Sequence, residues 1–256
     1  MARNTTYLIT GANRGIGRAL SSTLLLRPST TVIATIRTST TSTTALLSLP
    51  VGQNSKLIIL PLDFSSSSTS PEVFTNFLQT LTIQHGIKAI DTVIANAGTG
   101  TSFAAAKDTV ISDMRDNWEV NTLGPILLYQ ALYPLLTSAS ESGKDERKFI
   151  LISSSLGSIE AMEGGVPSLA YGVSKAAGNY FVRKVHFEEK GIVTLAVHPG
   201  WVKTANGQAF ADSIGVAAPP MSVEDSARGV LEQIDRATKA TTSGSFLSYD
   251  GTVIPW

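Results

Sequence analysis

The sequence predicts an α/β fold in which a parallel, seven-stranded sheet is doubly wound and carries helices on both faces. Short apolar runs alternate with longer amphipathic stretches along the whole chain. The apolar runs contain few polar residues, as is typical of strands that are buried on both faces of a parallel sheet. The length of 256 residues, 43% of them hydrophobic, is enough for one such domain with a large core.

The seven expected strands are short, and most of them are separated by a stretch with helical periodicity. They cover Thr6–Thr10, Val32–Ile36, Leu57–Leu60, Asp91–Ala95, Phe149–Ser153, Ile192–His198 and Ser245–Ser248. The expected helices are Arg14–Leu26, Pro71–Gln84, Asp116–Leu136, Ala170–Lys190 and Val223–Ala237, and Gly124-Pro125 should bend or offset the third of them. No repeat or linker divides the chain, so we expect a single Rossmann-like domain over residues 1–256 with right-handed crossovers.

Composition argues against several classes of function. The 20 Lys and Arg residues balance the 20 Asp and Glu residues, so bulk charge gives no support for nucleic acid or a membrane surface as a partner. The chain has no cysteine, which excludes disulfides and thiolate catalysis, and its three histidines lack metal-ligand spacing, so no metal site is expected. Without an apolar run of membrane-spanning length or a signal peptide, the expected location is cytoplasmic.

A glycine-rich segment, Thr10-Gly11-Ala12-Asn13-Arg14-Gly15-Ile16-Gly17, follows the first strand and opens a helix. Glycines allow the backbone to approach a pyrophosphate closely, and the helix N-terminus presents free N–H groups to the phosphates. A tight strand-to-helix turn would give the same spacing, but the strand–loop–helix context favours a dinucleotide site. The residues expected to bind the dinucleotide here are Gly11, Asn13, Arg14, Gly15, Ile16 and Gly17.

Tyr171 and Lys175 are four residues apart on an expected helix and therefore share a face. A phenol with a pKa near 10 is a poor acid or base at neutral pH, but a nearby ammonium would favour the phenolate and lower that pKa. The pair would then serve as a general acid/base. Taken alone, the same spacing more often marks an exposed pair on an amphipathic helix.

Six motifs occur in an order that resembles the short-chain dehydrogenase/reductase superfamily, in its single-domain branch. They span nearly the whole chain and fall at the ends of expected strands or on expected helices. They are the glycine segment, Asn96-Ala97-Gly98, Asn121, Ser153-Ser154-Ser155-Leu156-Gly157, Tyr171 with Lys175, and Pro199-Gly200. The resemblance implies an oxidoreductase that transfers hydride between a nicotinamide cofactor and a carbonyl group.

The resemblance also implies a catalytic role for four residues. Tyr171 would donate a proton to the carbonyl oxygen, and Ser154, three residues before Gly157, would polarise that oxygen. Ser153 and Ser155 would be packing or capping residues. Lys175 would tune Tyr171 and bind the nicotinamide ribose, and Asn121 would hold a water that links Lys175 to solvent.

The expected cofactor is NADPH, with NADH less favoured. In NAD-binding relatives the second strand ends in an acidic residue, whereas Arg37 and Thr38 follow it here. Arg37 and Arg14 could pair with a 2′-phosphate, although Arg14 could equally be a surface residue. By resemblance Asp63 would accept from the adenine amine or cap the next element. The other cofactor contacts that the resemblance implies are Asn96, Ala97, Gly98, Pro199, Gly200, Val202 and Thr204.

Residues 205–220 lack a regular pattern and lie where relatives carry a mobile lid over the substrate. Candidate pocket residues are apolar or small, which suits a hydrophobic or aromatic ketone: Leu156, Ser158, Ile159, Met162, Trp201, Phe210 and Ile214. The ending Gly244–Trp256 and the segment WVKT resemble a subgroup with Sniffer-type carbonyl reductases, the C-factor group and fungal norsolorinic acid ketoreductase-like proteins. Polyketide or aryl ketones would fit such relatives.

Other functions stay open beside ketone reduction. They are the oxidation of a secondary alcohol with NADP, a non-redox reaction in the same site, and a cofactor-sensing protein without catalysis. The presence of all four predicted catalytic residues argues against the last. Relatives commonly form dimers or tetramers through helices that correspond to Tyr171–Lys190 and Asp116–Leu136, so a homo-oligomer is expected.

Overall fold

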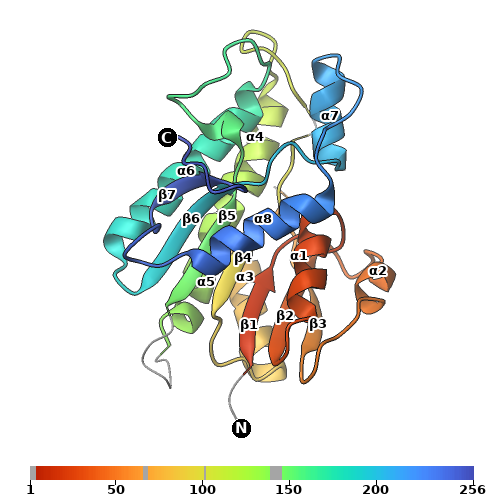
Figure 1. Cartoon of the computed structure of the whole chain (residues 1–256), viewed down its shortest axis with the longest axis vertical. Coiled ribbons are helices and arrows are strands. Elements are labelled where there is room, and N and C mark those ends of the chain that lie inside the picture. Colours follow the sequence, from red (N-terminus) through yellow and green to blue (C-terminus); the bar gives the residue numbers. More distant parts are fainter. Residues whose placement is uncertain (1–3, 66–68, 101, 139–145) are drawn as a thin grey trace.

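The computed structural model describes residues 4–65, 69–100, 102–138 and 146–256, and within these ranges seven strands form one parallel sheet (Figure 1). The strands are β1 (Thr5–Ile9), β2 (Thr30–Ile36), β3 (Lys56–Pro61), β4 (Thr92–Ala95), β5 (Arg147–Ile152), β6 (Ile192–His198) and β7 (Ser245–Ser248). Their order across the sheet is β3-β2-β1-β4-β5-β6-β7. The direction of winding reverses between β1 and β4, which confirms the predicted doubly wound sheet.

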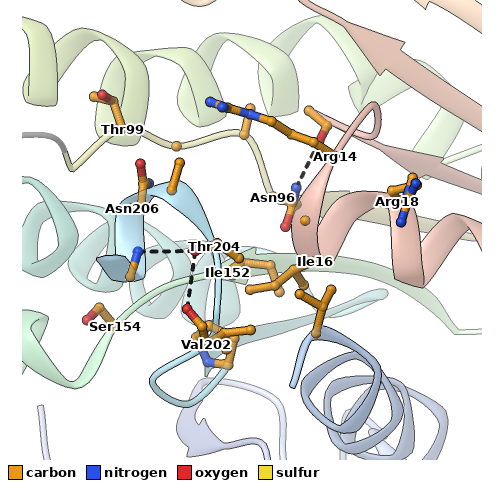
Figure 2. A pocket seen from close by; sticks show the side chains of 18 of the residues that line it. Arg14, Ile16, Arg18, Asn96, Thr99, Ile152, Ser154, Val202, Thr204 and Asn206 are labelled. Atoms are coloured by element: carbon orange, nitrogen blue, oxygen red, sulfur yellow. Dashed lines mark hydrogen bonds between the residues drawn. The ribbon is translucent and has the colours of Figure 1, made fainter. Parts of the chain in front are cut away.

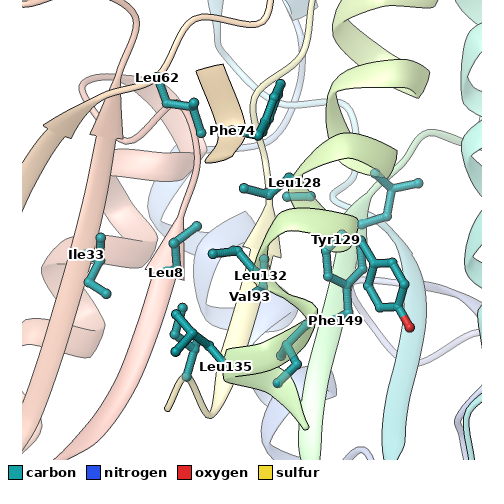
Figure 3. Close-up of a cluster of buried hydrophobic side chains, with 14 of the residues drawn as sticks. Leu8, Ile33, Leu62, Phe74, Val93, Leu128, Tyr129, Leu132, Leu135 and Phe149 are labelled. Carbon is teal, nitrogen blue, oxygen red and sulfur yellow. The ribbon is translucent and has the colours of Figure 1, made fainter. Parts of the chain in front are cut away.

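Helices cover both faces of the sheet because the strands are apolar on both sides. Helices α1 (Gly15–Leu25) and α8 (Val223–Arg236), with the short α2 (Thr44–Leu47), bury apolar side chains against one face. Helices α3 (Pro71–Gln79), α5 (Gly124–Leu136) and α6 (Leu169–Glu188) cover the other face, and α4 (Ile111–Trp118) packs beside α6. Figure 3 shows part of this second core, where Leu128 and Leu132 of α5 lie over Val93 of β4.

The long middle helix starts earlier than predicted and changes pitch within its length. Helix α4 begins at Ile111 instead of Asp116, and a π-helical turn, η2 (Glu119–Leu123), joins it to α5 at Gly124. The predicted interruption at Gly124-Pro125 therefore takes the form of this π turn. Gly124 has a packing reason as well, since a side chain there would overlap the ring of Phe64. The π turn contains Asn121, and such turns are frequent at functional sites.

Two short helices were not predicted from the sequence. Residues 205–220 were expected to lack regular structure, but α7 (Ala205–Ser213) occupies their first half, beyond the carboxyl end of the sheet (Figure 1). It forms because the Thr204 hydroxyl caps its start by accepting from the N–H of Gly207. The helix was not predicted because glycine, here Gly207, is unfavourable inside a helix. Glycine is required at this position because a side chain would overlap the carbonyl of Val202. The second is α2, whose four residues are too few for a periodic signal.

The helix predicted for residues 71–84 comprises α3 and a π-helical turn, η1 (Thr80–Gln84). The polar residues 38–43, between β2 and α2, form a loop. Among the described residues, no helix combines the length and the apolar character needed to cross a bilayer.

Candidate active site

A cavity of about 1300 Å³ opens at the carboxyl end of the sheet, where β1 and β4 diverge. This is the point at which doubly wound folds bind their ligands, because the loops after the two strands leave in opposite directions. Figure 2 shows Ser154 toward one end of the cavity and Arg18 toward the other, with Ile16 and Ile152 between them. The volume is large enough for a dinucleotide with a small substrate beside it.

The glycine segment lines the part of this cavity above β1. Gly11 and Gly15 have φ angles of +63° and +53°, a region that favours glycine. Gly17 is required for close packing, since a Cβ there would lie 2.5 Å from the Gly11 oxygen and 2.6 Å from Asn96 Nδ2. Asn96 in turn donates from Nδ2 to the carbonyl oxygen of Thr10 at 2.8 Å. The segments after β1 and β4 therefore hold each other in place.

The first turn of α1 is suited to an anion. Arg14 occupies the N-cap position, makes no side-chain capping bond, and is followed by no acidic residue in the first turn. The N–H groups at the start of an α-helix have no helical partner, and the helix dipole adds positive potential there. The start of α1 thus fits the pyrophosphate of a dinucleotide, the group that the glycine spacing predicts.

Positive side chains gather where the adenosine half of a dinucleotide would lie. Arg14 and Arg37 are exposed and line the cavity, and Arg18, which was not singled out from the sequence, lies beside them. Arg37 follows the last residue of β2, where NAD-binding relatives carry an acid. Asp63 also lines the cavity, but its carboxylate accepts from the N–H and the hydroxyl of Ser65, each at 2.9 Å. Asp63 therefore forms an Asx turn with Ser65, and the next helix, α3, has Ser70 as its N-cap residue.

The three consecutive serines after β5 have different hydrogen-bond partners. The Ser153 hydroxyl donates to Asn179 Oδ1 at 2.6 Å, and the Ser155 hydroxyl lies 3.4 Å from a Glu163 oxygen. Ser154 lines the cavity, accepts from the N–H of Leu156 at 3.3 Å, and is close enough to Tyr171 to lower the pKa of the phenol. Ser154 is thus the serine of the three that lies beside Tyr171, as the family pattern implied.

Tyr171 and Lys175 lie on one face of α6 and both line the cavity. The Lys175 ammonium is 5.6 Å from the centre of the Tyr171 ring, and it donates to the carbonyl oxygen of Ile152 at 2.9 Å. Burial raises the pKa of Tyr171 to about 12, and the Ser154 side chain lowers it only in part. The expectation that the neighbouring ammonium would lower this pKa is therefore wrong for the polypeptide alone, because desolvation of the phenolate outweighs that attraction.

Burial also lowers the pKa of Lys175, to about 8. The side chain is 3% exposed, so its charged form has lost most of its hydration. Near neutral pH Lys175 is still mostly an ammonium and Tyr171 is a neutral phenol. The pair is consequently set to donate a proton rather than to accept one.

Asn121 is fully buried and joins three segments around the site. Its Oδ1 accepts from the N–H of Thr99 at 2.9 Å, and its Nδ2 donates to the Thr99 carbonyl at 2.8 Å. Nδ2 also lies 2.9 Å from the hydroxyl of Ser174 and 3.2 Å from Asn117 Oδ1. The side chain thus ties the loop after β4 to α6, one residue before Lys175.

His198, at the end of β6, is a site residue that the sequence argument missed. Its Nδ1 accepts from the N–H of Ser155 at 3.0 Å, so this nitrogen carries no proton and the other one does. Burial lowers the pKa of His198 to about 4, which keeps the ring neutral at physiological pH. His198 therefore positions the serine loop. The sequence gave little reason to select His198, because a single histidine without metal-ligand spacing does not indicate a contact with the serine loop.

The segment after β6 lines the middle of the cavity. Pro199, Gly200, Val202 and Thr204 all lie there, as do Ala97 and Gly98 after β4. Gly200 has a φ angle of +85°, and a side chain at this position would overlap Met221. Thr204 packs directly against Gly15, since a Cβ on Gly15 would lie 3.3 Å from the Thr204 methyl group. The predicted contacts from three separate loops are thus brought together.

The far end of the cavity is aromatic. Leu156, Trp201, Phe210 and Ile214 line it as predicted, together with Phe103, which the sequence argument missed. The Trp201 ring lies 5.3 Å from that of Phe210, and its Nε1 donates to the carbonyl of Gly207 at 3.1 Å. Phe103 follows β4 by eight residues in a segment without periodicity, so only the fold places it here.

Ser158, Ile159 and Met162 do not line the cavity, contrary to expectation. Ile159 and Met162 are 70% and 67% exposed, whereas Ser158 is buried. The Ser158 hydroxyl donates to the carbonyl of Pro255 at 2.7 Å and accepts from the N–H of Ala161 at 2.9 Å. The main-chain oxygen of Trp256 accepts from Ile159 and Glu160, so residues 158–161 pack on the C-terminal segment instead of a substrate.

This fold and this site are those of a short chain dehydrogenase, whose family model matches residues 5–214. The chain belongs to that family and is an oxidoreductase that acts on carbonyl or alcohol groups. It is 40% identical to the norsolorinic acid ketoreductase of Aspergillus parasiticus over 98% of this chain and 91% of that protein.

Two solved structures are similar over the whole chain. The NADPH-bound carbonyl reductase from chicken fatty liver is 28% identical with a TM-score of 0.83, and each chain covers all of the other. The carbonyl reductase Sniffer of D. melanogaster is 24% identical with a TM-score of 0.79 and full coverage of both chains, and shows the shared fold. These comparisons confirm the predicted family and its carbonyl reductase subgroup, and they support a nicotinamide cofactor.

Proposed function

We propose that the protein is an NADPH-dependent ketoreductase that reduces the carbonyl group of a hydrophobic, aryl or polyketide-derived ketone. The observation that carries the proposal is the position of Ser154 beside the Tyr171 phenol in the cavity that the glycine segment lines. A carbonyl oxygen bound between these two residues could accept from both hydroxyl groups. The relative named a norsolorinic acid ketoreductase supports this substrate class.

The residues of the chain divide the work as follows. NADPH, when bound, supplies the hydride. Tyr171 holds the proton that the carbonyl oxygen needs, and Ser154 can donate to that oxygen because its own oxygen already accepts from the N–H of Leu156. Lys175 places a positive charge near the phenol and binds the nicotinamide ribose. Asn121 positions the loop after β4 against α6, and the water relay implied for it belongs to the same proposal.

The raised pKa of Tyr171 favours reduction over the alternative, the oxidation of a secondary alcohol. Reduction requires the protonated phenol, whereas oxidation requires the phenolate as a base. With a pKa of about 12, the phenol is protonated throughout the neutral range. We therefore expect reduction to proceed at neutral pH and oxidation to increase as the pH rises.

NADPH is proposed as the cofactor because the cavity carries cations where the second ribose would lie. Arg37 and Arg14 would bind the 2′-phosphate, and Arg18 adds positive charge nearby. Asn13, Gly15, Ile16 and Gly17 would contact the pyrophosphate. Ala97 would pack beside the adenine ribose, and Pro199, Val202 and Thr204 would hold the nicotinamide half. The NADPH named with the chicken carbonyl reductase supports this choice.

Residues 205–220 are proposed to form a lid over the substrate. Helix α7 places Phe210 in the cavity, and Thr204 caps its start. Because Thr204 is also a proposed cofactor contact, cofactor binding can alter the position of α7. Gly215 has a φ angle of +71° and gives the segment a flexible point after the helix.

A homo-oligomer is proposed from the outer surface of α6 and α4. Val173, Tyr180 and Phe187 are spaced by seven residues on α6 and are 41%, 73% and 70% exposed, and Trp118 of α4 is 45% exposed. Residues seven apart share a helix face, so these side chains form an apolar stripe that a second copy can cover. Light scattering of the wild type and of Tyr180→Glu tests this, and a monomeric wild type would reject it.

The function is tested by following NADPH oxidation with a panel of aryl ketones and with NADH as the matched cofactor. The proposal predicts turnover with NADPH, at least about tenfold lower kcat/KM with NADH, and formation of the secondary alcohol. Tight NADPH binding without reduction of any ketone in the panel would favour the non-redox or cofactor-sensing alternative. Equal rates with NADH would overturn the cofactor assignment.

A further inference from the structure

Four aromatic rings form a continuous row from the proposed proton donor to the proposed lid. The ring of Tyr171 lies 5.6 Å from that of Phe103, Phe103 lies 5.2 Å from Phe210, and Phe210 lies 5.3 Å from Trp201. Neighbouring rings are inclined by 56° to 65°: the two contacts of Phe103 are tilted, and the contact between Phe210 and Trp201 is edge to face. All four rings line the cavity.

The row is held from both ends. Gly100 packs against the Tyr171 ring, since a Cβ there would lie 2.8 Å from the ring carbons. At the other end, the indole N–H of Trp201 donates to the carbonyl of Gly207 on α7. Phe103 and Phe210, in the middle, carry no polar atoms. The side chains of Phe103 and Phe210 therefore offer no hydrogen bond to a substrate and favour contact with an apolar or aromatic surface.

The position of Phe103 determines which part of a ketone it meets. A carbonyl oxygen that accepts from Tyr171 and Ser154 has its carbon, and the groups attached to it, next to the phenol ring. Phe103 is the neighbouring ring of the row, and Phe210 is the next one outward. A ring bonded to the carbonyl would thus contact Phe103, and a second fused ring would extend toward Phe210.

We propose that Phe103 and Phe210 determine specificity for ketones in which the carbonyl is bonded to a flat, fused aromatic ring system. The inference rests on the proposed ketoreductase function and names the substrate class of that site. Aromatic pairs in inclined or offset contact are more favourable than their buried area alone predicts, so a flat ring gains over a saturated one of the same carbon skeleton. Phe103 and Phe210 are specificity residues, and neither takes part in proton transfer.

The test compares wild type with Phe103→Leu on 2-acetylnaphthalene and its fully saturated counterpart, 2-acetyldecalin, with NADPH. Leucine keeps an apolar side chain but removes the ring. We expect the ratio of kcat/KM for the aromatic ketone to that for the saturated ketone to fall about tenfold in Phe103→Leu, and by a similar factor in Phe210→Leu. Differences in intrinsic reactivity between the ketones cancel when this ratio is compared between variants.

Ile83→Ala is the control, because Ile83 is 79% exposed in η1 and lies outside both the cavity and the proposed oligomer surface. Its ratio should equal that of wild type. A ratio in Phe103→Leu within about twofold of wild type would overturn the proposal and show that the rings only pack the loop after β4 against α7. Equal losses on both ketones would lead to the same conclusion.

Calorimetric binding of both ketones to the protein with NADP⁺ separates this inference from the proposed function. If wild type reduces neither ketone, the ketoreductase proposal fails for this substrate class, while the binding data still decide the role of the rings. Tighter binding of the aromatic ketone that is lost in Phe103→Leu would support the specificity role. Equal affinities for the two ketones in wild type would reject it.

Discussion

The ammonium of Lys175 donates to the main-chain carbonyl of Ile152 at 2.9 Å, in a position that is 3% exposed. This bond joins α6 to the last residue of β5, directly before the serine loop. A buried cation with a single carbonyl partner is stabilised incompletely, which is why the pKa of Lys175 is lowered to about 8. The proposed site thus contains a charge that the fold retains at a cost in stability.

Replacing Lys175 by methionine should therefore stabilise the protein while abolishing activity. The pKa of Lys175 in the folded protein, about 8, lies below its ordinary value of 10.5, so the stability contributed by Lys175 is full above about pH 10.5 and is lost as the pH falls through about 8. At about pH 7 we expect Lys175→Met to unfold with a free energy higher by about 1 to 3 kcal/mol, and this gain should shrink as the pH rises toward 10.

Urea unfolding of both proteins between about pH 6.5 and 9.5 measures this difference. Lys184→Met, a change of an exposed lysine on the same helix that pairs with Glu188, serves as control and should show no such gain. A Lys175→Met variant that is less stable than wild type at neutral pH would show that the buried ammonium is well solvated or paired.

Arg37 should determine the preference for NADPH. It is exposed at the end of β2 and lines the cavity, so its removal should leave the fold intact. We expect Arg37→Ala to raise the Kd for NADPH about tenfold, because a charge-assisted hydrogen bond to the 2′-phosphate is lost, and to leave the Kd for NADH within about twofold. Fluorescence titration with the two cofactors measures both constants, with Lys107→Ala as the control. An equal rise in the Kd for both cofactors would show that Arg37 contacts a part of the dinucleotide other than the 2′-phosphate.

Ser158 should matter for stability rather than for substrate binding. Its hydroxyl is buried and joins Pro255 to Ala161, so Ser158→Ala leaves a carbonyl and an N–H without their partner. We expect the free energy of unfolding to fall by about 1 to 3 kcal/mol and the KM for a ketone to stay within about twofold. Thermal unfolding and steady-state kinetics test this against Ser112→Ala, an exposed serine on α4. A higher KM at unchanged stability would restore Ser158 as a substrate contact.

Much of the fold was predictable because the apolar runs of a doubly wound sheet are nearly continuous. β2, with seven buried residues, is the clearest case. The start of α4 at Ile111 was missed because the apolar Ile111 and Trp118 are exposed while the polar Asn117 is buried, so the helix lacks the usual amphipathic pattern. The start of α7 was missed because Gly207 serves close packing there and resembles a loop residue.

For the candidate site, the motifs located the residues that must approach a cofactor. Glycines are needed at 11 and 15 for their positive φ angles and at 17 for close packing, so the sequence itself indicates the backbone geometry there. The substrate end was predicted less well. Phe103 reaches the cavity only through tertiary structure, and Ser158 turns away to the C-terminal segment. The pKa of Tyr171 also depends on burial, which the four-residue spacing to Lys175 does not reveal.

The central claim is that Tyr171 supplies the proton for carbonyl reduction, and the most direct measurement is the rate of NADPH oxidation by Tyr171→Phe with a ketone that wild type reduces. The account predicts a fall in kcat of at least about 100-fold with the Kd for NADPH within about twofold of wild type, while Tyr180→Phe, altered at an exposed position on the same helix, keeps full activity. A Tyr171→Phe variant that retains more than about half of the wild-type rate would contradict it.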